Sequence, residues 1–425
     1  MRLRLLAIAM LLSWSAAAHA ADSDNQYTFA FHGFVGGSLY GQDAHLGPSA
    51  GGQPMWVDKT LSTDKLSLGG DIRQTRLNFS LAGPKVLNGA TPKAVVEIDF
   101  FGGNSSGGFG DVSVFPRMRE AYAELAWENT TIQVGQQYSL VLGVSTVSTP
   151  FLPASVGHVA FPVTYAAGTI GWRYPGIYMY ERIPVGSDTK LELALEVARS
   201  AWANPANPGE VNGNLVPFFT DTPGLGEASG LPQIEARAML ANKMFQGFVT
   251  GHWSSVDPTG DGVSPLAGAA CTPGTLKSQS SGCGNVETMA VNGGLRGIFG
   301  PLTIQGAGYV GQNTAPLLGE IVQFQNLALG DVKEWGAWGQ AGFNFTPELS
   351  LWGLIGTERL DTGDAARAFA GNANARWQNT SSQGMLQYAE KGYKVGLEFT
   401  HWLTRTLGNG NLNGNQLMAS AFYFF

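Results

Sequence analysis

The segment NQLMASAFYFF, residues 415–425, alternates between two kinds of side chain along its length. Leu417, Ala419, Tyr423 and Phe425 belong to one apolar set with a spacing of two residues. A period of two is typical of a β-strand that has one face in an apolar medium. Chain ends of soluble domains are usually polar, and an unpaired apolar strand invites aggregation. The segment therefore predicts a last strand that is paired on both edges.

The first twenty residues have the pattern of a secretory signal. A basic start, MRLR, precedes an apolar run from Leu5 to Trp14, and the stretch ends in the A-x-A sequence AHA. The apolar run is too short to cross a bilayer as a helix. We therefore expect residues 1–20 to be removed on export and residues 21–425 to form one barrel domain.

The composition of the chain favours a membrane protein without spanning helices. Charged residues make up 13% of the chain, whereas about 25% is usual in a soluble domain. Without the signal, which holds two arginines and no acidic residue, 23 basic and 32 acidic residues remain, a net charge of −9. The longest uncharged stretch, residues 139–170, contains Pro150, Pro153 and Pro162, which exclude a spanning helix. A closed β-barrel satisfies these conditions, and the acidic balance argues against a nucleic-acid partner.

Strand-like alternation recurs throughout the chain. In residues 73–83, for example, Leu77 and Phe79 share one face while Arg76 and Asn78 share the other. Such segments predict an all-β, antiparallel transmembrane barrel of about sixteen strands, wide enough for an aqueous channel. The predicted strands lie near residues 27–40, 67–82, 92–101, 116–127, 131–138, 171–183, 189–199, 231–242, 244–254, 287–299, 301–312, 333–345, 348–358, 383–390, 393–402 and 415–425.

The connections between these segments alternate between short and long. This alternation is typical of outer-membrane barrels, which have short periplasmic turns and long external loops. We expect both chain ends on the periplasmic side, where the last strand closes the barrel by pairing with the first. The predicted long loops are residues 41–66, 102–115, 139–170, 200–230, 255–286, 313–332, 359–382 and 403–414.

Four segments resemble strands of a known family: DIRQTRLNFSLAGP, AVVEIDFFGG, RMREAYAEL and IQVGQQYS, which begin at residues 71, 94, 117 and 132. They are similar to the equivalent strands of DcaP-like porins, and the whole chain resembles the sixteen-strand trimeric porins of Gram-negative outer membranes. The resemblance implies a homotrimer in outer-membrane lipid that passes small hydrophilic solutes. It also implies that the terminal Phe425, with Tyr423 nearby, is an assembly signal for the barrel-insertion machinery.

The third long loop, residues 139–170, follows the fifth predicted strand. In trimeric porins the loop at this place folds into the lumen, and the apolar, proline-rich sequence here favours the same buried position. An external loop packed at a trimer contact is the alternative. The loop has no Asp, Glu, Lys or Arg, and we expect His158 to add anion preference below about pH 6, where an imidazole gains its charge.

Four arginines are candidates for the opposite wall of the channel. Alternation places Arg76 in the lumen, and Arg73, Arg117 and Arg119 lie near the mouth by the same resemblance. Arginine binds carboxylate and phosphate groups well, which favours anionic solutes.

The alternative for these arginines is that they pair with carboxylates of the same wall. The candidate partners are Glu97, Asp99, Glu120 and Glu124. Such pairing would leave a general pore of weak selectivity. A β-bulge near residues 117–124 would change which side chains face inward.

Other motifs point to structure instead of chemistry. Cys271 and Cys283 are the only cysteines, and in an oxidising compartment we expect a disulfide; a metal pair would lack further ligands. No cofactor is expected. Calcium on external loops is a minor alternative for two Asp-Gly segments, which are more often turns. The segments are DPTGDG and LDTGD, with Asp257, Asp261, Asp361 and Asp364.

The chain has no H-E-x-x-H or G-x-S-x-G motif, and we expect no enzymatic activity. A barrel enzyme of the lipid-hydrolase type and an adhesive or structural barrel remain as alternatives to a porin. The segments NGGLRGIFG and IQGAGYVG contain Gly293, Gly297, Gly306 and Gly308. We expect these glycines on a flat outer face where barrels meet, although glycine also relieves strand curvature.

Overall fold

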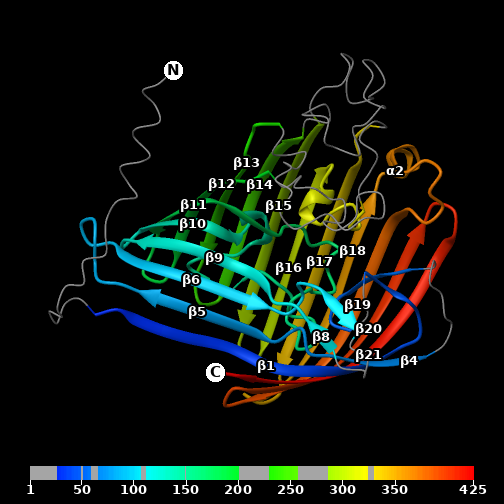
Figure 1. Ribbon diagram of the computed structural model, residues 1–425, viewed down its shortest axis with the longest axis horizontal. Coiled ribbons are helices and arrows are strands. Elements are labelled where there is room, and N and C mark those ends of the chain that lie inside the picture. Colours follow the sequence, from blue (N-terminus) through cyan, green and yellow to red (C-terminus); the bar gives the residue numbers. More distant parts are fainter. Residues whose placement is uncertain are drawn as a thin grey trace.

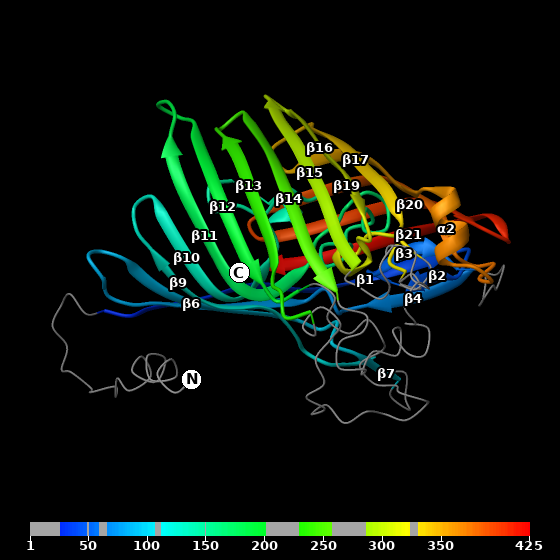
Figure 2. The same ribbon diagram turned by 90° about the horizontal axis from the view of Figure 1, so that it is seen from above.

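The computed structural model describes residues 26–48, 51–58, 66–106, 112–148, 150–200, 229–256, 286–323 and 330–425. Its main sheet is antiparallel and closed, because β1 pairs with β21 on one edge and with β4 and β5 on the other. β4 and β5 pair with successive parts of β1 and form one interrupted strand. The barrel therefore has 16 strands, which confirms the prediction, and Figures 1 and 2 show the strands side by side around it.

The strands of the barrel have the following bounds: β1 Thr28–Gln42, β4 Ser67–Asp71, β5 Arg76–Ala82, β6 Thr91–Asp99, β9 Arg117–Ala126, β10 Thr130–Tyr138, β11 Arg173–Pro184, β12 Lys190–Ala198, β13 Gln233–Ala241, β14 Phe245–Val256, β15 Val286–Phe299, β16 Leu302–Gln312, β17 Lys333–Asn344, β18 Leu349–Leu360, β19 Arg376–Glu390, β20 Tyr393–Thr406 and β21 Gly410–Phe424. Two short hairpins lie outside the main sheet: β2 Leu46–Pro48 with β3 Pro54–Val57, and β7 Asn104–Ser106 with β8 Val112–Val114.

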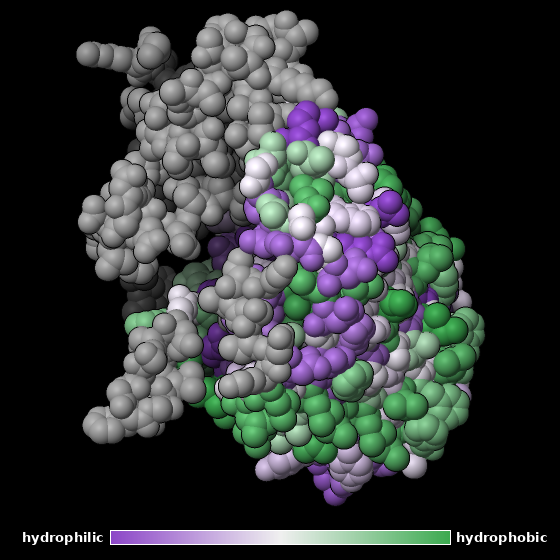
Figure 3. Space-filling view, turned by 90° about the vertical axis from the view of Figure 1, so that its right-hand side faces the viewer, coloured by the Kyte–Doolittle hydropathy of each residue, from purple (hydrophilic) through white to green (hydrophobic). Residues whose placement is uncertain are grey.

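Side chains alternate between the lumen and the outer face along each strand. In β20, Leu397 and Phe399 are 49% and 51% exposed, whereas Glu398 and Thr400 between them are 0% and 1% exposed. This arrangement is inverted relative to a soluble protein, because the apolar side chains lie outside and the polar ones inside. Figure 3 shows hydrophobic residues along the lower and right-hand margins of the molecule and hydrophilic residues in the middle of the same view.

The connections alternate in length as predicted, with one exception. Short turns, such as residues 127–129, 242–244 and 391–392, join every second pair of strands. The predicted long loop at residues 403–414 is wrong, because β20 and β21 continue through it and leave only a turn at residues 407–409. The Gly- and Asn-rich sequence suggested a loop, but pairing with β20 keeps it extended.

The second predicted strand, residues 67–82, is interrupted between Asp71 and Arg76. Here Thr75 N–H donates to Ile72 O at 3.1 Å and the chain makes a turn. The turn directs Gln74 into the interior, where its side chain is fully buried. The interruption thus places an amide group beside the loops inside the barrel.

The described residues contain little helix. A seven-residue helix, α2 Thr362–Ala368, and two short 3-10 turns, η2 Leu140–Leu142 and η3 Ala315–Leu317, lie in loops. Among the described residues, no helix has the length and apolar character needed to cross a membrane.

Candidate channel constriction

Loop 3, residues 139–172 between β10 and β11, lies inside the barrel as predicted. Leu140, Val141 and Phe151 are at most 2% exposed. The ring centre of Phe151 lies 5.0 Å from that of Phe248 on the inner face of β14. The apolar side chains that made an exposed loop unfavourable are therefore buried against the inner wall.

Carboxyl groups of the wall hold the first part of loop 3. Leu140 N–H donates to Glu196 at 3.0 Å and Val141 N–H donates to Glu235 at 2.7 Å. Glu192 accepts from the backbone N–H of Thr146 at 3.1 Å and is paired with Arg237 on β13. All three carboxyl groups are fully buried behind the loop.

A second set of contacts holds the middle of loop 3. Glu398 accepts from Val156 N–H at 3.0 Å, from Gly157 N–H at 2.8 Å and from the Ser155 hydroxyl at 2.7 Å. Gln74 accepts from Ala160 N–H at 2.9 Å and donates to Gly157 O at 2.7 Å. Because hydrogen bonds to charged or buried partners are strong, this network fixes the position of the loop.

The placement of His158 differs from our expectation. Its side chain is 0% exposed, and its Nδ1 lies 3.4 Å from Glu398 Oε2 while its Nε2 lies 3.1 Å from Gln416 Oε1. His158 thus faces the wall behind loop 3 instead of the channel. The reason is that Glu398 binds the loop backbone at Val156 and Gly157, which brings the adjacent imidazole of His158 to the same carboxyl group.

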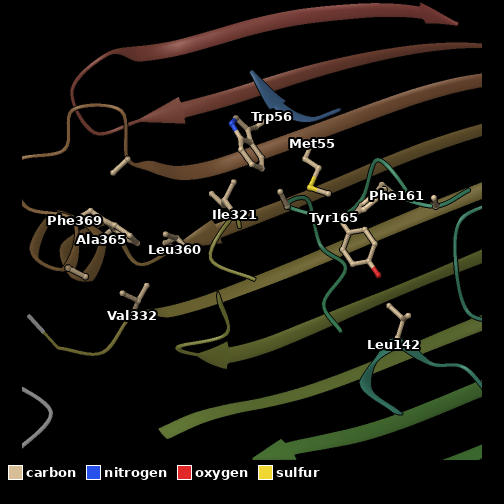
Figure 4. Packing of buried hydrophobic residues seen from close by; sticks show 14 residues of the cluster. Met55, Trp56, Leu142, Phe161, Tyr165, Ile321, Val332, Leu360, Ala365 and Phe369 are labelled. Carbon is tan, nitrogen blue, oxygen red and sulfur yellow. The ribbon is translucent and has the colours of Figure 1, made fainter. Parts of the chain in front are cut away.

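Other loops join loop 3 inside the barrel and form one apolar cluster. The β2–β3 hairpin contributes Met55 and Trp56, and loop 6, residues 313–332, contributes Ile321. Figure 4 shows these side chains and Tyr165 of loop 3 pointing into the same space between the strands. The lumen is therefore narrowed by several loops, whereas the sequence predicted loop 3 alone.

Loop 6 has an unusual backbone at Glu320, Ile321 and Val322, whose φ angles are 53°, 54° and 51°. A left-handed backbone costs non-glycine residues about 1–2 kcal/mol each. Contacts with the wall offset this cost: Ile321 N–H donates to Glu358, and Arg376 donates to Ile321 O at 2.9 Å. Burial raises the pKa of the Glu320 carboxyl, and the nearby Glu358 and Asp331 carboxylates add to the rise.

On the opposite wall, Asp99 of β6 connects two arginines of β9. Arg117 makes a two-pronged contact with it, with nitrogen–oxygen distances of 2.9 and 2.5 Å. Arg119 donates to the same carboxylate at 2.6 Å, and also to Glu97 at 2.6 Å and to the hydroxyl of Tyr138. The pairing that we considered as the alternative is thus present for both arginines.

A β-bulge brings these groups together. In the β6–β9 register, Glu97 lies opposite Glu120 but Ile98 lies opposite Met118, so Arg119 is the extra residue. Arg119 and Glu120 therefore both face inward, although they are adjacent in sequence. Glu120 makes no ion pair within the described residues. The other candidate partner, Glu124, accepts from Gln133 at 2.7 Å.

The remaining predicted arginines lie on the same inner wall. Arg73 forms a two-pronged contact with Asp71, with distances of 2.9 and 2.8 Å. Arg76 Nε lies 3.6 Å from Glu97, and its guanidinium lies over the ring of Phe34 at 5.3 Å. Its Nε and Nη2 have no hydrogen-bond partner within the described residues. Arg76 is therefore less firmly paired than its neighbours.

Sequence reasoning missed Arg173, the first residue of β11. Its guanidinium is 5% exposed and lies over Trp172 at 4.1 Å and over Tyr138 at 5.3 Å. Its Nη1 has no hydrogen-bond partner, and no carboxylate pairs with it in the part of the chain that the structure describes. The only signal in the sequence was that Arg173 is the first charged residue after the long apolar loop.

Aromatic rings separate the guanidinium groups of this cluster. Arg73 and Arg117 lie 4.6 and 5.4 Å from the ring centre of Phe101, and Arg117 also lies 4.8 Å from that of Phe161. Cation–π contacts of this kind stabilise neighbouring positive charges that would otherwise repel each other. We call Arg73, Arg76, Arg117, Arg119 and Arg173 the arginine wall.

A Ser–His–Glu trio occurs on β13 and β14, although no sequence motif indicated one. His252 Nδ1 lies 2.8 Å from Glu235 and its Nε2 lies 3.0 Å from the Ser254 hydroxyl. Ser254 and Glu235 are 0% exposed, and Glu235 also accepts from Val141 of loop 3. The trio is thus part of the loop anchor, with no exposed nucleophile.

The other predicted sites are either outside the described residues or differently used. Residues 1–20, Cys271, Cys283, Asp257 and Asp261 lie outside them. Asp361 caps α2 by accepting from Gly363 and Asp364 N–H groups at 2.9 Å, and Asp364 pairs with Arg367. Within the described ranges no group of three or more His, Cys, Asp or Glu side chains is placed to hold a metal ion.

Comparisons with known proteins address the fold. No protein-family model matches the chain, and no curated protein matches it. Among solved structures, the chain is similar to the outer membrane channel DcaP of Acinetobacter baumannii, with 17% identity and a TM-score of 0.66 over 94% of this chain and 97% of that one.

Two further structures are similar at lower scores. The anion-selective porin from Comamonas acidovorans has 10% identity and a TM-score of 0.54, over 94% of this chain and 100% of that one. Salmonella typhi OmpF, in complex with daunomycin, has 11% identity and a TM-score of 0.52, over 93% of this chain and 97% of that one. The chain thus has the fold of the sixteen-stranded outer-membrane porins.

Proposed function

We propose that the protein is a passive diffusion channel of a Gram-negative outer membrane and that it passes small hydrophilic solutes, with a preference for anions. The porin fold and the inward polar, outward apolar alternation support the channel. The arginine wall supports the preference. Residues 1–20 then act as the export signal, residues 21–425 form the barrel, and the barrel-insertion machinery places it in outer-membrane lipid as a homotrimer.

The outer face supports the membrane position. Exposed apolar residues follow the strands, and aromatic residues gather at the end where the short turns lie. Tyr393, Tyr423 and Phe425 are 60%, 48% and 41% exposed there. An aromatic girdle of this kind marks the interface between lipid and water.

The distribution of charges around the lumen supports anion preference. On β12, β13 and β20, the carboxyl groups of Glu196, Glu235 and Glu398 are buried behind loop 3 and bind its N–H groups. Arg173 on β11, in contrast, has no carboxylate partner among the described residues. Glu120 offsets part of this positive field. The buried Arg173 guanidinium, which forms no ion pair within the described ranges, is the single observation that favours anions over weak selectivity.

The test is the reversal potential of the purified protein in planar bilayers across a KCl gradient. A unit charge about 7 Å from an ion in water contributes about 0.6 kcal/mol, or about a threefold change in local anion concentration. The same potential changes the local cation concentration by the same factor in the opposite direction. We therefore expect Arg173→Gln to lower the anion-to-cation permeability ratio about eightfold, and Arg76→Gln to act in the same direction.

Arg367→Gln on α2 removes a charge that is paired with Asp364 and lies outside the arginine wall, and it should leave the ratio unchanged. Equal ratios for wild type and Arg173→Gln would show a general pore. Absence of steady ohmic steps from the wild-type protein would contradict the channel itself and favour an adhesive or enzymatic barrel.

A further inference from the structure

The outer face of the barrel has a pair of arginines at the end where the long loops lie. Arg359 of β18 and Arg405 of β20 both lie opposite Gln378 of β19 in the sheet register. Since neighbouring strands are about 4.8 Å apart, the Cα atoms of the two arginines are about 10 Å apart. Their side chains can therefore reach one ligand between them.

The two guanidinium groups share an aromatic ring. Trp377 is the extra residue at the bulge between Arg376 and Gln378, and its ring centre lies 5.4 Å from Arg359 Cζ and 5.6 Å from Arg405 Cζ. Arg405 Nη1 donates to Gln378 Oε1 at 3.2 Å, while its Nε is buried and has no hydrogen-bond partner in the described part of the chain. Neither arginine forms an ion pair within the described residues.

The height of the pair on the barrel matches a lipid head group. Arg405 lies twelve positions along β20 from Tyr393, which is in the aromatic girdle near the short turns. At about 3.4 Å per residue and a tilt of about 40°, these positions span about 30 Å, whereas the apolar band of such barrels is about 25 Å tall. Arg405 thus lies just beyond the far edge of the band.

The side chains around the pair are suited to a head group and its sugar or glycerol part. Trp335 of β17 lies opposite Arg359 in the register and is 44% exposed. On the membrane side of the pair, the outward positions Thr380 and Ser382 of β19 mix hydroxyl groups with apolar neighbours such as Leu403. Hydroxyl, indole and guanidinium groups together favour a polar, negatively charged lipid head.

We infer that Arg359 and Arg405 bind the phosphate group of an outer-leaflet lipid on the outer face of β18–β20, with Trp377 holding both guanidinium groups in place. Guanidinium groups bind phosphate through paired, charge-assisted hydrogen bonds. Two positive charges that have no carboxylate partner among the described residues supply the charge complementarity. The inference rests on the proposed membrane position but not on the selectivity of the channel.

The test measures retention of diphosphoryl lipid A by the detergent-purified full chain, counted by native mass spectrometry during titration. Each guanidinium–phosphate contact is worth about tenfold in affinity. We expect Arg359→Gln combined with Arg405→Gln to weaken binding about a hundredfold, and each single change to weaken it about tenfold. Added salt should weaken binding to the wild type more than to the double variant.

The matched control is Lys243→Gln combined with Lys391→Gln, which removes the same charge from the short turns at the opposite rim and should not change binding. Heat-modifiable mobility on gels verifies that every variant is a folded barrel, and the single variants serve if the double variant does not fold. Unchanged lipid affinity in the variants would overturn the inference. Displacement of the lipid by an equal concentration of inorganic phosphate would also overturn it, since the site would then bind free phosphate.

Two further outcomes separate this inference from other proposals. If the double variant loses its oligomeric state while lipid binding persists, the face is a contact between copies of the chain and the inference is wrong. Channel conductance in bilayers of neutral lipid should be equal for the double variant and wild type. A failed conductance test therefore affects only the proposed function, and a failed lipid test affects only this site.

Discussion

Asp99 is the residue on which the charge of the arginine wall depends most. Its carboxylate is fully buried and contacts both Arg117 and Arg119, so it cancels part of two positive charges at once. We expect Asp99→Asn to raise the anion-to-cation permeability ratio, in the direction opposite to Arg173→Gln. The measurement is again the reversal potential across a KCl gradient, and the rise should be about eightfold for one unit charge.

Asp364→Asn is the control for this change, because Asp364 pairs with Arg367 on α2 in the same way. An asparagine at position 99 also leaves a buried arginine less well paired, which destabilises a protein by about 3–5 kcal/mol. The barrel must therefore be verified as folded before the potential is compared. A ratio that stays constant in folded Asp99→Asn would mean that the arginine wall does not set the field.

At the scale of elements, loop 3 depends on its anchors. Glu398 accepts three hydrogen bonds from residues 155–157 and lies beside His158. We expect Glu398→Ala to remove roughly 3 kcal/mol or more of anchoring free energy. The loop should then fluctuate, which single-channel recordings would register as greater open-channel noise and a higher mean conductance.

Glu398→Gln is the matched variant, since its amide oxygen still accepts hydrogen bonds from the loop. We expect its recordings to lie between those of wild type and Glu398→Ala. Identical noise in all three proteins would indicate that apolar packing, such as that of Phe151 against Phe248, holds the loop without the carboxyl group.

The closing pair of strands, β1 and β21, depends on Phe425 at the rim. Phe425 exchanges backbone hydrogen bonds of 3.1 Å with Gly33, and its ring lies 5.0 Å from that of Phe31 on the outer face. We expect Phe425→Ala to slow insertion and to leave aggregates in the periplasm, because both the assembly signal and the girdle contact are lost. Cell fractionation measures this outcome.

Phe424→Ala is a matched control of the same residue type, since the Phe424 ring lies 4.9 Å from that of the buried Phe34. It should insert faster than Phe425→Ala. Wild-type levels of Phe425→Ala in the outer membrane would show that the last residue contributes packing only.

For the whole molecule, the predicted homotrimer depends on a flat outer face. Gly293, Gly297 and Gly308 occupy outward positions on β15 and β16, as expected. Gly306 has a second reason to be glycine, because a Cβ there would lie 2.6 Å from Trp338 O. Next to them, Gly339 of β17 has no atom within 4 Å of an added Cβ, so a larger side chain would project outward.

We expect wild type to migrate on unheated gels at about three times the monomer mass, and Gly339→Leu to weaken this species because leucine keeps the barrels apart. Ala94→Leu on β6 adds a similar bulk to the opposite wall and should leave the trimer intact. The reverse result would place the contact on the β6 wall, and a wild-type monomer under all gentle conditions would contradict the trimer.

The sequence by itself determined the barrel and the direction of its faces. A period of two is a local property, so segments such as residues 393–402 indicated which side chains lie outside without knowledge of their neighbours. Proline and the lack of charge in residues 139–170 likewise indicated an internal loop. Where strong turn residues occurred, as in the segment around Gly410, the local rule failed because pairing with a neighbouring strand kept the chain extended.

Only the tertiary structure decided which charges meet. Arg119 and Glu120 both face the lumen because a bulge in β9 breaks the alternation, and no sequence rule places that bulge. His158 turned away from the channel because Glu398, distant in sequence, lies behind the loop. Among the described residues Arg173 has no carboxylate partner, and the registers of β18 and β20 with β19 place Arg359 and Arg405 on either side of Gln378. Charge pairing depends on positions in space, whereas alternation depends only on positions along the chain.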